Sequence, residues 1–147
     1  RSEGISNINS REYFKELCGH LFATYSVSSQ QIKVSYEVED ISLELAHGIP
    51  LGLITNELVT NVIKYAFNGR EEVGAVSISL QEGKENLVFV FSDNGLGLPP
   101  GFDPTVTKSM GFRLIQILSR QLRGTYKFKN VGGLTFELSF PKDELDE

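Results

Sequence analysis

The chain has 147 residues, a formal net charge of −5 and 40% hydrophobic residues, which is the composition of one globular domain of about 100–200 residues. A chain of this size buries enough surface to fold without disulfides or a structural metal. The single cysteine, Cys18, excludes an internal disulfide, no apolar run reaches the ~20 residues of a membrane helix, and the negative charge argues against a nucleic-acid-binding surface.

The spacing of apolar residues predicts two helices and two strands in the first half of the chain. They are expected over residues 10–25 (helix), 32–38 (strand), 41–45 (strand) and 49–67 (helix). Asn9 and Glu12 form a potential capping box for the first helix. Pro50 is expected in the first turn of the second helix, where proline is tolerated.

The second half of the chain is expected to form four strands and one helix, over residues 76–80, 87–91, 111–122 (helix), 125–129 and 134–140. The almost wholly apolar run at 87–91 predicts a buried strand. Residues 98–110 contain three prolines and little pattern, which indicates a functional loop. The mixed order of strands and helices predicts an α/β two-layer sandwich, with helices packed on one face of a mixed β-sheet.

Polar residues at helical spacing form a first motif. Glu57, Asn61 and Lys64 follow at i, i+4 and i+7, so they share the helix face opposite the apolar stripe. An amide oxygen suits Mg²⁺, an ammonium group neutralises phosphate, and a carboxylate orients or deprotonates an attacking group. The alternative is an amphipathic helix with a solvated polar face.

Two further motifs lie next to predicted elements: one directly follows a strand, and the other lies at the start of a helix. Asp93 can accept a hydrogen bond from an amine such as that of adenine, and Gly95 and Gly97 allow the backbone to approach a ligand. A tight turn is the alternative. At the start of the late helix, Gly111 and Arg113 lie where free N–H groups and the helix dipole favour a phosphate. An ordinary helix start is the alternative there.

Other nucleotide and metal signatures are missing from the sequence. It contains no Gly-Lys-Ser/Thr phosphate loop, and residues 95–100 do not fit the dinucleotide Gly-x-Gly-x-x-Gly pattern. His20 and His47 lack metal-ligand spacing, and Cys18 is interpreted as a core thiol.

In their order along the chain, the three motifs resemble the N box (residues 57–64), G1 box (93–97) and G2 box (109–114) of one ATP-binding domain. Histidine kinases, DNA gyrase, Hsp90-type chaperones and MutL-type repair proteins share this domain, and its fold is known as the Bergerat fold. The short spacing between the boxes is similar to that of histidine kinases.

The amino-acid sequence of several segments is more specific and resembles one group within the histidine kinases. This is the group of sensor histidine kinases that have the second type of dimerization and phosphoacceptor region. The segments similar to its sequences are residues 49–61, 92–99, 121–124 and 134–141. The resemblance runs from residue 13 to residue 141, which is nearly the whole chain.

The resemblance implies that the chain binds ATP and Mg²⁺. Asp93 would bind the adenine amine, with Thr135 in support, and Asn61 would hold the Mg²⁺ ion. Glu57 occupies the position of the catalytic base, and residues 98–110 would form the ATP lid. The remaining nucleotide-binding positions would be Lys64, Gly95, Gly97, Gly111, Phe112 and Arg113.

The sequence departs from the family pattern in three places. Tyr65 stands where many relatives have histidine. Leu134 separates Gly133 from Thr135, where Gly-Thr is usual. The lid lacks the phenylalanine-rich box of other histidine kinases.

The resemblance further divides the chain into residues 1–27, an arm and the tail of a preceding dimerization and phosphoacceptor helix, and residues 28–147, the catalytic ATP-binding domain. Neither His20 nor His47 fits the phosphoacceptor position, so the acceptor histidine is expected outside this fragment. The expected partners are the dimerization domain of the same or a second polypeptide and a response regulator. The full-length protein is expected to be a dimer, with this domain in the cytoplasm.

Two other functions remain open at this point. One is a protein serine kinase of the anti-sigma type, which is built on the same fold. The other is a nucleotide-binding or scaffolding module that lacks transfer activity. The identity of the phosphorylated residue separates the two kinases, and nucleotide binding separates both from a scaffold.

Overall fold

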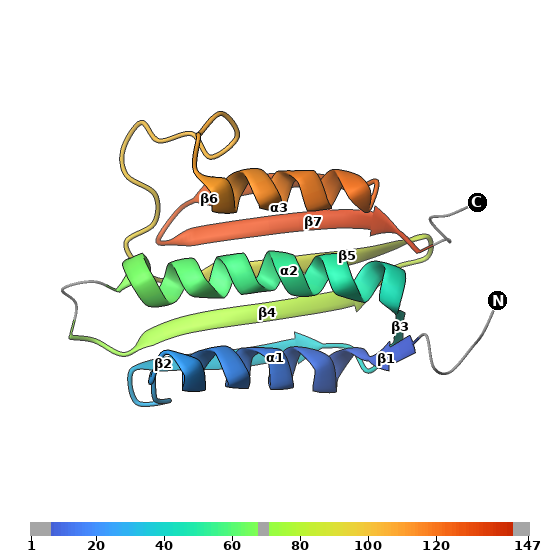
Figure 1. The fold of residues 1–147 in the computed structure, drawn as a ribbon, viewed down its shortest axis with the longest axis horizontal. Helices are drawn as coiled ribbons and strands as arrows, with labels where there is room; N and C mark the ends of the chain where they lie inside the picture. The colour runs from blue at the N-terminus through green and yellow to red at the C-terminus, as the bar shows by residue number, and fades with distance from the viewer. Residues whose placement is uncertain (1–6, 68–70, 143–147) are drawn as a thin grey trace.

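The computed structural model describes residues 7–67 and 71–142. Three helices cover one face of a five-stranded sheet, and a two-stranded ribbon lies at one end of it (Figure 1). The elements are β1 (Asn7–Asn9), α1 (Ser10–Thr24), β2 (Ile32–Val38), β3 (Ser42–Glu44), α2 (Leu45–Asn61), η1 (Val62–Ala66), β4 (Gly74–Glu82), β5 (Asn86–Asp93), α3 (Met110–Gln121), β6 (Thr125–Asn130) and β7 (Leu134–Pro141). The predicted two-layer α/β sandwich is confirmed.

The sheet is mixed, with the strand order β2-β4-β5-β7-β6. β2 runs parallel to β4, whereas the other neighbours pair antiparallel. The register places Val76 of β4 opposite Asp93 of β5, and Ser92 of β5 opposite Thr135 of β7. Because paired residues point to the same side of a sheet, this register decides which side chains share a face.

Within the described residues, helices cover one face of the sheet, and the strands alternate between buried and more exposed side chains accordingly. In β5, Phe89 and Phe91 are fully buried, whereas the side chain of Val88, which points to the other face of the sheet, is 37% exposed. The prediction that residues 87–91 form a strand is confirmed, but the strand is buried on one face only and not throughout. An apolar run can also form a strand with one wet face, because periodicity alone does not count the covering layers.

The central helix differs from its prediction at both ends. α2 begins at Leu45, directly after β3, so Pro50 lies in the second turn and not the first. Its missing N–H removes one bond inside the helix. After Asn61 the α-helix passes into the π-helix η1, and one-turn π segments of this kind are frequent at functional sites.

The first helix packs in the same core as the rest of the sandwich. Phe14 and Cys18 of α1 are fully buried, and the Phe14 ring stacks on Phe89 of β5 with centroids 5.8 Å apart. The predicted division at residue 27 therefore separates elements that share one hydrophobic core. The structure gives α1 the place of a third helix in the layer.

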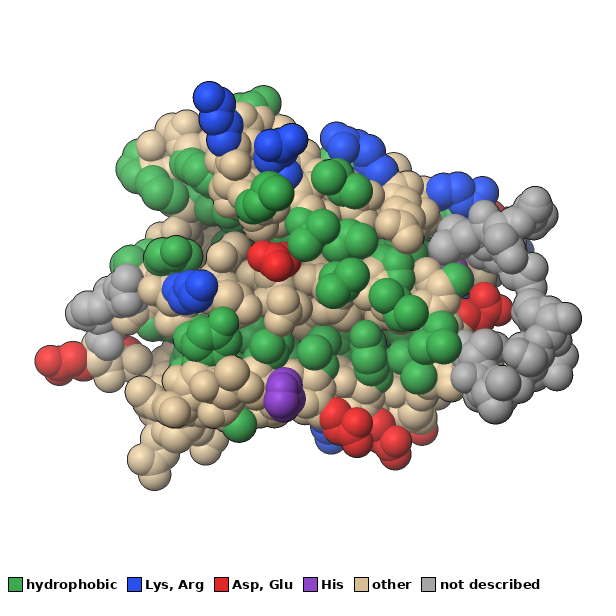
Figure 2. Space-filling model, viewed as in Figure 1, with side chains coloured by type: hydrophobic (Ala, Val, Ile, Leu, Met, Phe, Trp, Pro, Cys, Tyr) green, Lys and Arg blue, Asp and Glu red, His purple; other side chains and the backbone are tan. Residues whose placement is uncertain are grey.

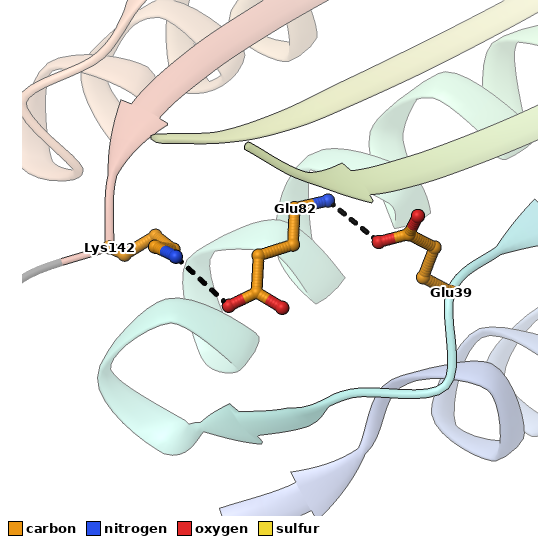
Figure 3. A network of polar contacts seen from close by, with 3 residues as sticks. All are labelled: Glu39, Glu82 and Lys142. Carbon is orange, nitrogen blue, oxygen red and sulfur yellow. Dashed lines mark hydrogen bonds and ion pairs between the residues drawn. The ribbon is translucent and has the colours of Figure 1, made fainter. Parts of the chain in front are cut away.

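A polar network closes the end of the sheet where β4 finishes. Glu82 donates its backbone N–H to Glu39 Oε1 at 2.9 Å, and Lys142 Nζ contacts Glu82 Oε2 at 3.1 Å (Figure 3). These side chains are partly exposed, and such pairs contribute on the order of 0–1 kcal/mol. Asp93 lies at the opposite end of the sheet, where β5 finishes and β4 begins. No helix in the described ranges is long and apolar enough to cross a membrane.

Candidate functional site

The end of β5 meets the end of the central helix, which brings the first two motifs together. Leu96 donates its N–H to the carbonyl of Ala66, the last residue of η1, at 2.7 Å. A Cβ on Gly95 would lie 2.4 Å from that same carbonyl oxygen, which is closer than real side chains approach. Glycine at position 95 is therefore required for contact between two parts of the chain itself.

Asp93 is the most enclosed carboxylate of the site, at 9% exposure. Its Oδ1 accepts the Gly95 N–H at 2.8 Å, and the Leu134 N–H lies 3.5 Å away. Burial raises the pKa of the Asp93 carboxyl above its ordinary value, and the two N–H groups oppose that rise. A carboxylate can accept from more donors than these, so Asp93 has capacity for a ligand amine.

Sequence reasoning missed one glycine beside Asp93. Gly133 has a φ of +121°, and a Cβ there would lie 2.0 Å from the backbone oxygen of Asp93. The hairpin between β6 and β7 thus closes directly over the end of β5. The signal was present in the Gly132-Gly133 pair, which is typical of a tight turn.

The first and third motifs meet where α2 faces α3. A Cβ on Gly111 would lie 2.9 Å from Glu57 Oε1 and 4.0 Å from Asn61 Nδ2. Gly111 at the start of α3 therefore lies directly against the Glu57 carboxylate and close to the Asn61 amide. Lys64 is exposed and lies within η1, so the ideal helical spacing applies to Glu57 and Asn61 alone.

The start of α3 offers backbone donors to an anion. Ser109 precedes the helix but makes no capping hydrogen bond with its side chain, so the first N–H groups remain available to a ligand. Arg113 is exposed at this end. Phe112 is 8% exposed, and its ring packs between Phe102 and Phe128, with centroid distances of 5.7 and 5.6 Å. Its side chain therefore belongs to the support of the site.

The structure does not bring Thr135 to Asp93. Thr135 pairs with Ser92, whose hydroxyl faces Ser77 on the helix-free side of the sheet. Asp93 follows Ser92 and points to the opposite, helix-covered face. Leu134 takes the position on the Asp93 side, because adjacent residues of a strand point to opposite faces of the sheet.

The donor set fits a magnesium ion that is shared with a phosphate ligand. Mg²⁺ is commonly held by one or two protein oxygens together with phosphates and water, and Glu57 and Asn61, whose side chains lie next to Gly111, each carry such oxygens. The described residues contain no group of three or more His, Cys, Asp or Glu side chains able to hold a metal. A metal site made by protein groups alone is thus unsupported there.

The local charge differs from the net charge. The segment from residue 104 to residue 136 contains no acidic side chain, and its basic residues are Lys108, Arg113, Arg120, Arg123, Lys127 and Lys129. Figure 2 shows Lys and Arg side chains along the edge of the molecule formed by α3. An anion approaching the start of α3 therefore meets a basic edge on an acidic protein.

Two surface hollows lie elsewhere. One, of about 330 Å³, is on the helix-free face of β6 and β7 and is lined by Lys127, Glu137 and Ser139 among others. The second, of about 360 Å³, lies between β3 and the end of β4 and includes Glu44 and Glu82. Neither is lined by a predicted site residue, so the candidate site rests on the meeting of the three motifs.

Comparison with known proteins agrees with this geometry. Residues 46–144 match the model of the Histidine kinase-, DNA gyrase B-, and HSP90-like ATPase family. The sensor histidine kinase PdtaS of Mycolicibacterium smegmatis is 30% identical over 102 residues, which are 67% of this chain and 20% of that protein. PdtaS of Mycobacterium tuberculosis is 35% identical over 74 residues, or 50% of this chain and 15% of that protein. The chain thus spans a fifth or less of the length of these relatives.

Solved structures show the same fold. The histidine kinase domain of the blue-light activated histidine kinase EL346 from Erythrobacter litoralis aligns with a TM-score of 0.82 and 20% identity, over 96% of this chain and 66% of that one. The Acinetobacter baumannii histidine kinase AdeS aligns with a TM-score of 0.70 and 14% identity, over 94% of this chain and 67% of that one. From the family match over most of its length, together with the observed fold, the chain belongs to the Histidine kinase-, DNA gyrase B-, and HSP90-like ATPase family.

Proposed function

We propose that this chain is the ATP-binding catalytic domain of a sensor histidine kinase, and that it transfers the γ-phosphoryl group of ATP to a histidine outside residues 1–147. The observation that carries the proposal is the meeting of three sequence motifs at one end of the sandwich. Asp93 lies against Gly95, Gly95 against the end of η1, and Gly111 against Glu57 and Asn61.

The chemistry suits phosphoryl transfer, in which a protein mainly positions the reactants and neutralises charge. Asp93 accepts a hydrogen bond from the adenine amine. The phosphate chain extends toward Lys64 and the first N–H groups of α3. The charge of the Lys64 ammonium group and the partial positive charge of the N–H groups offset the negative charge of the phosphate oxygens. Asn61 would hold Mg²⁺, which supplies further charge neutralisation when bound.

Glu57 is the proposed general base, which accepts a proton from or orients the attacking imidazole. Its carboxylate lies against Gly111 at the start of α3, the end at which the γ-phosphoryl group is expected. Thr135 is left out of the proposed site, because its side chain faces the other side of the sheet. The nucleotide-facing roles of Arg113 and the Phe112 backbone follow from their place at the start of α3.

The finer context rests on the relatives. We place the acceptor histidine on a dimerization domain of the same or a partner polypeptide, and the next acceptor on a response regulator aspartate. The full-length protein is proposed to be dimeric, with this domain in the cytoplasm.

Calorimetric titration with a non-hydrolysable ATP analogue and Mg²⁺ tests the proposal. The unmodified chain should bind one nucleotide. Asp93→Ala should weaken binding by about 10–100-fold or more, as expected when a hydrogen bond to a charged group is lost. Asn61→Ala should instead reduce the dependence of binding on Mg²⁺.

Asp40→Asn is the matched control, since it neutralises an exposed carboxylate outside the site. Its affinity should equal that of the unmodified chain. Absence of binding by the unmodified chain would favour a scaffolding module, and binding that survives Asp93→Ala would mean that the adenine pocket is elsewhere. Glu57→Ala that leaves phosphoryl transfer intact would remove Glu57 from the catalytic residues.

A further inference from the structure

The loop that precedes α3 is held at its start by Asn130, the last residue of β6. Leu98 donates its N–H to Asn130 Oδ1 at 2.8 Å, and Asn130 Nδ2 donates to the Leu98 carbonyl at 3.1 Å. One side chain thus satisfies both backbone groups of one residue, as a neighbouring strand would. Gly97 makes this possible, because a Cβ there would lie 2.3 Å from Asn130 Oδ1.

The middle of the loop is held by Gln116, a buried side chain of α3. Its Nε2 donates to the Pro104 carbonyl at 2.9 Å, and its Oε1 accepts from the Tyr126 hydroxyl of β6 at 3.0 Å. The orientation of the amide is determined by its partners, because the Pro104 carbonyl can only accept. Gln116 is 6% exposed, so each of these bonds is formed away from water.

An aromatic contact secures the stretch between these two points. The ring of Phe102 packs on Phe112 with centroids 5.7 Å apart, and Phe112 packs edge-on against Phe128 at 5.6 Å. Pro104 is buried as well. Residues 98–104 are therefore tied to α3 and β6 by two polar anchors and one apolar contact.

Residues 105–109 differ from the stretch before them. In the described part of the chain, the hydrogen bonds of this segment join near neighbours: Thr105 and Val106 donate to Asp103, Ser109 donates to Thr107, and the Ser109 carbonyl accepts from Arg113 in the first turn of α3. Val106 is 76% exposed. This segment leads directly to Gly111, which faces Glu57 and Asn61.

We propose that the lid is divided into a fixed part, residues 98–104, and a movable part, residues 105–109, and that Gln116, Tyr126 and Asn130 are positioning residues for nucleotide binding. The inference rests on the proposed function for its ligand, whereas the anchors themselves exist without one. Fixing the first part means that fewer residues lose conformational freedom when the nucleotide orders the lid. Movement is thereby confined to the phosphate side of the site.

Hydrogen exchange of the whole chain without nucleotide, read by mass spectrometry, tests the anchors. In residues 98–104, where the three prolines have no amide hydrogen, the hydrogen-bonded amides of Leu98 and Phe102 should exchange slowly, and the amides of residues 105–109 should exchange quickly. Tyr126→Phe removes the hydrogen bond from Tyr126 to Gln116, and Gln116→Met removes that bond and the one from Gln116 to Pro104, while the volume of each side chain is nearly kept. Each should speed exchange in residues 98–104 by about tenfold, as expected for a lost buried hydrogen bond, with β5 and β7 unchanged.

Tyr25→Phe is the matched control, since it removes the hydroxyl of an exposed tyrosine at the end of α1 and should leave exchange of the loop unchanged. Equal exchange of residues 98–104 in all variants would overturn the proposal. So would faster exchange that extends to β5 and β7, because Gln116 would then act only as a core residue.

Titration of the same variants with the ATP analogue and Mg²⁺ separates the lid from the site itself. Tyr126→Phe and Gln116→Met should weaken binding about three- to tenfold, less than loss of Asp93, because they raise only the cost of ordering the loop. Affinities equal to that of the unmodified chain would remove the positioning role. If neither the unmodified chain nor any variant binds nucleotide, but the predicted exchange pattern is observed, the proposed function is wrong and the division of the loop into a fixed and a movable part is still supported.

Discussion

At the residue scale, the glycines of the candidate site are explained by the chain's own atoms. Gly95 lies against the Ala66 carbonyl, Gly97 against the Asn130 amide and Gly111 against the Glu57 carboxylate. The expectation from sequence was close approach of the backbone to a ligand. The structure adds a cause that operates without one, since each glycine lets two separate elements meet.

Gly95→Ala is expected to destabilise the fold by about 1–3 kcal/mol, because a methyl group 2.4 Å from a backbone oxygen forces the two segments apart. Urea unfolding followed by circular dichroism measures the change. Gly19→Ala is the control: no atom lies within 4 Å of its Cβ position on α1, and alanine should raise stability by about 0.5–1 kcal/mol. A neutral Gly95→Ala would show that the contact yields easily.

The Asp93 carboxyl should make stability depend on pH. Its pKa is raised in the folded state by burial, so the folded protein holds this proton to higher pH than the unfolded chain does. The sign follows from linkage: this group's contribution is fully present below its unfolded pKa and is lost as pH rises through the folded value.

Comparison of the unmodified chain with Asp93→Asn by urea unfolding at a series of pH values checks this. Relative to the variant, the unmodified chain should lose stability as pH rises from about 4, until Asp93 is ionised in the folded state. Parallel curves, or a relative gain with rising pH, would contradict the raised pKa.

At the element scale, α1 belongs to the segment that the sequence analysis separates from the catalytic domain at residue 27. In the structure its apolar stripe packs against the sheet, with Phe14 on Phe89. The Tyr13 hydroxyl also donates to the Gly48 carbonyl of α2 at 2.9 Å. α1 is thus bound both to the strands and to the helix that carries Glu57 and Asn61.

Phe14→Ala should therefore cost about 3–5 kcal/mol in the free energy of unfolding, as expected for a fully buried aromatic side chain. Unfolding should remain a single transition by fluorescence of tyrosine and by circular dichroism. Glu16→Ala, at an exposed position of the same helix, should change stability by less than about 0.5 kcal/mol. Two separate transitions would instead support the predicted division of the chain near residue 27.

At the scale of the whole molecule, charge is distributed unevenly. The net charge of −5 coexists with a stretch from residue 104 to residue 136 that carries only basic charged side chains. An anionic nucleotide would be repelled at long range and attracted near α3, and salt screens both effects. Binding at the candidate site therefore depends on short-range contacts, and the residues that make these contacts are far apart in the chain.

Nucleotide binding should stabilise the entire fold, because the site is made by β5, α2 and α3 together. At a concentration one hundred times its Kd, the ATP analogue should raise the free energy of unfolding by about 2.7 kcal/mol. A thermal shift measured with and without analogue checks this. Asp93→Ala, which binds more weakly, should show a much smaller shift at the same analogue concentration, and a shift of equal size in that variant would place the ligand elsewhere.

The sequence by itself determined the two-layer class, the three motifs and the elements other than β1 and η1, because hydrophobic period and short motifs depend on residues that are near one another in the chain. Only the tertiary structure decided the early start of α2, the π-helical turn at Lys64 and the packing of α1. It also decided that Thr135 faces away from Asp93 and that Gly95 faces Ala66. Each of these depends on strand register or on contacts between distant segments, and a shift of one residue in register reverses every side chain of a strand.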